Sequence, residues 1–135
     1  MIFHTFGNNT NKVVIFIHGM LTPWQIWNEA IEYWSKDYYV ILPELDAHTE
    51  ETKSTFESVE KEAEKIKNYL CDTVGGKVYM MCGLSMGGRI AAIRMKEVSP
   101  QTEIRCYKGY AHAYLACFEQ QKWIGEVSKW LKMEV

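Results

Sequence analysis

The alternation of short apolar runs with longer amphipathic stretches limits most strongly which folds are open to this sequence. Apolar, strand-like runs occur at Val13 to Ile17, Tyr38 to Leu42 and Lys77 to Cys82, with a less apolar fourth run at Glu103 to Tyr107. Stretches with helical spacing separate them, and the first carries a stripe formed by Trp24, Trp27, Ile31 and Trp34. Successive βα units of this kind predict a three-layer α/β/α fold with a mostly parallel sheet of about four or five strands.

Two helix starts are predicted from capping patterns. Thr22 and Pro23 supply an N-cap and a first helical residue, and Gln25 completes a capping box. Ser54 and Glu57 form a second capping box, which predicts the start of the helix before Gly75 and Gly76. The final amphipathic helix carries its apolar residues on one side, at Trp123, Ile124, Val127, Trp130 and Leu131.

Size and charge exclude several classes of protein. A chain of 135 residues is predicted to form a single domain over residues 1–135. The net charge of −2 provides no basic surface for a phosphate backbone, so no nucleic-acid partner is expected. No apolar stretch approaches the roughly 20 residues of a membrane span, and residues 1–10 contain neither the basic run nor the long apolar segment expected of a signal peptide. We therefore expect a soluble, cytoplasmic protein.

The segment from Gly83 to Gly87 is the most informative part of the chain. Its sequence, Gly-Leu-Ser-Met-Gly, fits the G-x-S-x-G pattern of a nucleophile elbow, in which Ser85 projects from a tight strand-to-helix turn. The glycines on either side leave room for the chain to pass close to itself. An apolar strand precedes the pattern and a helix follows it, as this motif requires. The sequence therefore predicts Ser85 as a catalytic nucleophile.

With this elbow the sequence resembles the α/β-hydrolase family, and a second signature agrees. His18, Gly19 and Met20 end the first apolar strand, where the family has a His-Gly turn that supplies one oxyanion-hole amide. The resemblance implies oxyanion donors at the backbone N–H groups of Met20 and Met86, with His18 shaping the loop. Most of the chain matches the order of elements in this family, from Val13 to Gly88 and again from Glu103 to Leu131.

The resemblance also suggests the remaining catalytic groups. His112 follows the last strand and precedes the last helix, where the family carries its general base. Asp46 lies in a polar connection that also contains Glu44 and His48, and connections of this kind often carry function. Asp46 is a candidate for the triad acid or, alternatively, for the structural aspartate that the family carries at this turn. Glu119 is expected at the same end of the sheet as Ser85, but it inherits no role from the motif.

Compared with the family, the sequence lacks the region between the elbow helix and the histidine. The resemblance implies a minimal member without the cap or lid and without the strand that bears the usual acid. Such a chain would leave a sheet edge exposed, so we expect self-association as a homo-oligomer.

Three functions remain open at this stage. The first is a serine hydrolase, carboxylesterase-like, that acts on small acyl esters through an acyl-enzyme on Ser85; ester and amide substrates are not distinguished. The second is a weak or inactive relative that serves as a binding module. The third is a flavodoxin-like phosphate binder. The expected partner is a small-molecule acyl substrate, and no metal or organic cofactor is implied.

Overall fold

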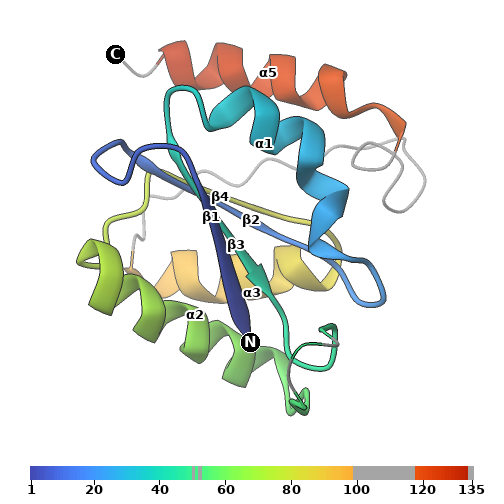
Figure 1. Cartoon of the computed structure of the whole chain (residues 1–135). Helices are drawn as coiled ribbons and strands as arrows, with labels where there is room; N and C mark the ends of the chain where they lie inside the picture. Colours follow the sequence, from blue (N-terminus) through green and yellow to red (C-terminus); the bar gives the residue numbers. More distant parts are fainter. Residues whose placement is uncertain (50, 52, 99–117, 134–135) are drawn as a thin grey trace.

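Four strands form one sheet between two helical layers (Figure 1). The computed structural model describes residues 1–49, 51, 53–98 and 118–133. The strand order is β1-β3-β2-β4, where β1 is Ile2–Phe6, β2 is Val13–Ile17, β3 is Tyr39–Glu44 and β4 is Met80–Gly83. β2 pairs in parallel with β3 and β4, whereas β1 pairs antiparallel with β3. The prediction of a mostly parallel sheet is confirmed.

Helices cover both faces of this sheet. The 3-10 helix η1 (Trp24–Trp27), α1 (Asn28–Trp34) and α5 (Gln120–Met133) lie on one face, and α2 (Val59–Val74) and α3 (Met86–Val98) lie on the other (Figure 1). The three-layer α/β/α architecture is therefore confirmed. None of the helices described is long and apolar enough to cross a bilayer.

β2 is an inner strand between β3 and β4 and is buried along its whole length. Its side chains alternate between the two faces, as in any strand. Val14 and Phe16 belong to the apolar core under α1 and α5, whereas Val13, Ile15 and Ile17 belong to the core over α2 and α3. One strand thus joins two separate cores, which explains why its sequence is a continuous apolar run.

The tryptophan stripe of the first helical segment packs onto the sheet as predicted. Phe16 of β2 lies 5.4 Å from Trp27 and 6.2 Å from Trp34 between ring centroids, and Trp123 of α5 lies 6.0 Å away. Aromatic pairs at these separations add about 0.5–1.5 kcal/mol each beyond the area they bury. Trp24 is only partly buried and stacks on His4 at 4.1 Å.

The first predicted capping box does not form. The helical segment opens with η1, whose N-cap position is Pro23, and no side chain caps it. The Thr22 hydroxyl instead donates to the carbonyl oxygen of Gly19 at 2.9 Å. The threonine therefore closes the preceding turn, and the prediction of a Thr22 N-cap was wrong.

The second predicted helix start lies four residues too early. Ser58 is the N-cap of α2, and its hydroxyl accepts from the Lys61 N–H at 3.2 Å. The Ser54 hydroxyl accepts from the Ala47 N–H at 3.1 Å, so it is bound to the loop after β3. The end of α2 agrees with the prediction, because Gly75 adopts the left-handed conformation there with φ 64°.

One strand of the sheet was not predicted, and one predicted strand lies outside the described residues. β1 was not predicted, and it forms the antiparallel edge of the sheet with Ile2 opposite Glu44. The strand predicted from Glu103 to Tyr107 falls within residues 99–117, outside the described residues.

Candidate active site

Ser85 lies at the sharp turn between β4 and α3. Its backbone is left-handed, with φ 52°, and its side chain is exposed. This conformation costs an L-residue roughly 1–2 kcal/mol, so the surrounding structure must hold it in place. The geometry lifts the hydroxyl out of the sheet at the carboxyl end of β4, as a nucleophile elbow requires.

Contacts at the two motif glycines explain the G-x-S-x-G spacing. A Cβ added to Gly83 would lie 2.3 Å from the carbonyl of Gly87. A Cβ added to Gly87 would lie 2.3 Å from the carbonyl oxygen of Ile17 and 2.6 Å from that of His18. The start of α3 therefore packs directly against the backbone of β4 and against the end of β2. Only glycine fits at these two positions.

The His-Gly loop lies next to the serine. A Cβ on Gly19 would lie 3.4 Å from the Ser85 Cβ. From Gly19 the chain makes a turn that ends at Thr22, whose N–H donates to the Gly19 carbonyl at 3.4 Å. Met20 occupies the second position of this turn, and Met86 is the first residue of α3, where helical N–H groups have no partner within the helix. The two predicted oxyanion donors thus come from the two loops that meet at Ser85.

Two histidines connect the loop after β2 to the loop after β3. His18 is buried, and its Nδ1–H donates to the Gly19 carbonyl at 2.8 Å while its Nε2 accepts from the Leu45 N–H at 3.0 Å. Burial lowers the pKa of His18 below its ordinary value. Both ring nitrogens are bound within the loops, in agreement with a role in shaping them.

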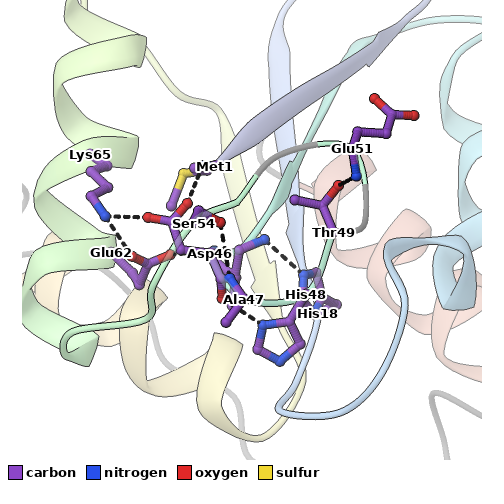
Figure 2. Close-up of polar contacts among 11 residues, drawn as sticks. Met1, His18, Asp46, Ala47, His48, Thr49, Glu51, Ser54, Glu62 and Lys65 are labelled. Atoms are coloured by element: carbon purple, nitrogen blue, oxygen red, sulfur yellow. Dashed lines mark hydrogen bonds and ion pairs between the residues drawn. The ribbon is translucent and has the colours of Figure 1, made fainter.

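His48 makes the reciprocal connection. Its Nδ1–H donates to the Asp46 carbonyl at 2.9 Å, and its Nε2 accepts from the Leu21 N–H at 3.1 Å. Its ring lies 5.0 Å from that of His18, edge to face (Figure 2). No role was predicted for His48, because its partner is 27 residues away in the chain.

The carboxylate of Asp46 is buried and engaged on the α2 side of the sheet. It forms ion pairs with Lys65 and with the Met1 amino group (Figure 2). Glu62 completes the cluster by accepting from the Asp46 N–H at 3.0 Å and pairing with Lys65 at 3.1 Å. These contacts tie the loop after β3 to α2, which is a structural task.

Of the two other predicted groups, the structure describes Glu119 but not His112. His112 falls within residues 99–117, outside the described residues. Glu119 precedes α5 and pairs with Lys122 at 3.3 Å. Within the described part of the chain, no group of three His, Cys, Asp or Glu side chains is placed to hold a metal ion.

A pocket of about 380 Å³ lies between the loops after β2 and β3, lined by Leu21, Thr22, Pro23, Ala47, His48 and Thr49. Two of these residues, Leu21 and Ala47, have left-handed backbones, with φ 59° and 61°. The pocket is open to solvent at the strongly exposed Leu21 side chain. It is large enough for a small organic group, and Leu21 and Thr22 of the turn after β2 form part of its wall.

Comparison with solved structures identifies the relatives of this fold. An α/β hydrolase family protein from Desulfitobacterium hafniense matches with a TM-score of 0.63 and 29% identity, over 69% of this chain and 39% of that one. A thermophilic esterase from Thermogutta terrifontis matches with a TM-score of 0.60 and 25% identity, over 71% of this chain and 35% of that one. This chain is a relative of the α/β hydrolases. The resemblance inferred from the elbow and the His-Gly turn is confirmed.

The match to the α/β-hydrolase relatives is partial. This chain spans less than half the length of the Desulfitobacterium hafniense protein and of the Thermogutta terrifontis esterase. A 1H-3-hydroxy-4-oxoquinoline 2,4-dioxygenase shares the fold with a TM-score of 0.64 at 15% identity, over 72% of this chain and 37% of that one. No protein-family profile and no curated protein sequence matches this chain.

Proposed function

We propose that this chain is a serine hydrolase of the α/β-hydrolase type that acts on small acyl esters. The observation that carries the proposal is the left-handed, exposed Ser85 at the turn from β4 to α3, with the Gly19 loop against it. The esterase among the similar structures supports the same reaction class. An open pocket between the turn after β2 and the loop after β3 suits a short substrate.

In the proposed mechanism, Ser85 Oγ attacks the ester carbonyl while His112 takes the hydroxyl proton. The N–H groups of Met20 and Met86 stabilise the oxyanion of the tetrahedral intermediate. His112 then returns the proton to the leaving alcohol as the acyl-enzyme forms. Water, activated by the same histidine, releases the acid and restores Ser85.

Cys82 does not compete as a nucleophile. It lies on β4, three residues before Ser85. Burial raises the pKa of its thiol to about 12. The thiol therefore stays protonated at neutral pH, and the thiolate is the reactive form.

The decisive experiment is an active-site titration with a fluorophosphonate probe, followed by p-nitrophenyl acetate turnover. We expect the wild-type chain to be labelled on Ser85, whereas Ser85→Ala and His112→Ala lose both labelling and turnover. Ser35→Ala, at the end of α1, is the matched serine control and should keep both. A well-folded wild-type protein that takes up no label would refute the proposal.

The second candidate is a weak or inactive relative that binds a small molecule. The engagement of Asp46 by Lys65 favours it, because that carboxylate is then not free to orient a catalytic histidine. The dioxygenase among the similar structures shows that this fold also serves other chemistry. Ligand binding that survives in Ser85→Ala, in a chain that takes no label, would support this candidate over the first.

A further inference from the structure

Among the described residues, three other than glycine have left-handed backbones, and all three lie at one end of the sheet. Leu21, Ala47 and Ser85, with φ 59°, 61° and 52°, follow β2, β3 and β4 respectively. These three strands run parallel, so their carboxyl ends lie at the same end of the sheet. Each residue needs a contact that holds it in a conformation it would otherwise avoid.

The Leu21 side chain cannot hold its own backbone in place. It is 90% exposed, so packing contributes little to the conformation of the turn. The Leu21 N–H, however, donates to Nε2 of His48 at 3.1 Å, which links the turn to the loop after β3. The turn is therefore bound to an acceptor in the loop after β3.

His48 is itself held by two hydrogen bonds so that Nε2 faces the Leu21 N–H. Its Nδ1–H donates to the Asp46 carbonyl at 2.9 Å, which leaves the lone pair on Nε2 and aims it at Leu21. Its backbone N–H donates to the Leu45 carbonyl at 3.1 Å. The ring of His18 packs against it at 5.0 Å (Figure 2).

We propose that His48 is a positioning residue that holds the oxyanion turn against Ser85. Met20 and Leu21 are consecutive, so a turn released at Leu21 rotates the peptide units next to it and moves the Met20 N–H. Gly19, at the start of the same turn, lies beside the Ser85 Cβ. This inference rests on the proposed function, in which the Met20 N–H stabilises the oxyanion.

Two substitutions separate the acceptor from the ring. His48→Gln keeps an acceptor near the position of Nε2, whereas His48→Phe keeps a ring and removes the acceptor. An oxyanion donor acts on the transition state, and deleting one costs about 10²–10³ in kcat. For a displaced donor we expect His48→Phe to lower kcat for p-nitrophenyl acetate by roughly 10–100-fold with little change in KM. His48→Gln should stay within about threefold of wild type.

A background substitution tests the link through Leu21. Leu21→Gly makes the left-handed conformation favourable without any partner. In this background, His48→Phe should lose much less activity than in the wild type. His4→Phe on β1 is the matched histidine control, because His4 pairs with Glu44 and stacks on Trp24, and it should keep wild-type kcat.

The outcomes distinguish the two proposals. A folded wild-type chain without activity would refute the proposed function and this role with it. An active wild type with unchanged His48→Phe would overturn the role of His48 alone. Equal losses in His48→Phe and His48→Gln would also overturn it. Glutamine keeps the acceptor but cannot transfer a proton, so equal losses would mean that His48 acts by proton transfer and not by positioning the turn. Circular dichroism of each variant establishes that it is folded.

Discussion

At the scale of single residues, close backbone contacts hold the elbow in place. Gly87 lies against the carbonyl oxygens of Ile17 and His18, where a side chain would require the backbone to move. The bare G-x-S-x-G pattern predicts a tight turn, but the partner of Gly87 in β2 is a tertiary contact that no local pattern contains. The motif therefore also joins α3 to β2.

Gly87→Ala is expected to destabilise the protein by about 3 kcal/mol and to abolish labelling of Ser85, because its Cβ would overlap the end of β2. Gly125→Ala is the matched control. It lies in α5 with no atom within 4 Å of an added Cβ, and alanine there should stabilise the fold by about 0.5–1 kcal/mol. Urea denaturation measures both changes. Similar stabilities for the two variants would contradict the packing described at Gly87.

The ion pairs of Asp46 predict how stability responds to acid. Burial alone would raise the pKa of the Asp46 carboxyl, but hydrogen bonds and positive charge from Lys65 and the Met1 amino group outweigh it and lower the pKa to about 2. This is below the ordinary value of 3.8, so the unfolded chain binds the proton more readily. The stabilisation is complete above about pH 4 and is lost as the pH falls towards 2.

Asp46→Asn should lower the free energy of unfolding at pH 7 by about 2 kcal/mol and flatten its decline between about pH 4 and pH 2. Denaturation at a series of pH values gives both quantities. Lys65→Met should raise the pKa of Asp46, because it removes one positive partner. If the free energy of unfolding of Asp46→Asn fell with pH as steeply as that of the wild type, Asp46 would not be the titrating group.

At the scale of elements, the sequence predicted which segments are helices and strands better than it predicted where helices begin. The periodic apolar residues of β2, α2 and α3 report burial directly, so these elements were predicted. A serine or threonine, by contrast, has several backbone groups within reach, and tertiary contacts decide among them. Thr22 bonds to Gly19 and Ser54 to Ala47, so neither caps a helix.

β1 and the role of His48 were missed for a related reason. β1 has no continuous apolar run, since His4 and Thr5 interrupt it, and its position follows from pairing with β3. His48 meets the Leu21 N–H only because β2 and β3 are neighbours in the sheet. The sequence predicted Ser85, Met20 and Met86 from local motifs, and local motifs cannot report a contact between two loops.

The cap of α2 provides a direct comparison of the two assignments. Ser58→Ala should lower the free energy of unfolding by about 1 kcal/mol, because the Lys61 N–H loses its acceptor. Ser54→Ala should change it by less than about 0.5 kcal/mol, since its partner is the N–H of an exposed loop residue. Thermal denaturation compares the pair. A larger loss for Ser54→Ala would favour the helix start expected from the sequence.

At the scale of the whole molecule, β1 is an outermost strand of the sheet and pairs with β3 on one side. Strand edges with free backbone groups favour pairing between molecules. We expect the chain to self-associate, with an apparent mass that rises with concentration in size-exclusion chromatography coupled to light scattering. A monomer at every concentration would contradict this expectation.

The parallel arrangement of β2, β3 and β4 also places Ser85 at one end of the sheet and the turn that precedes β4 at the other. The turn at Gly75 and Gly76 precedes β4, so it lies at the end of the sheet opposite Ser85, and an added Cβ on Gly75 meets no atom within 4 Å. Exposed turns of this kind tolerate insertions. A fluorophore or an affinity handle inserted between these glycines would thus give access to the protein for imaging or immobilisation while leaving the approach to Ser85 open.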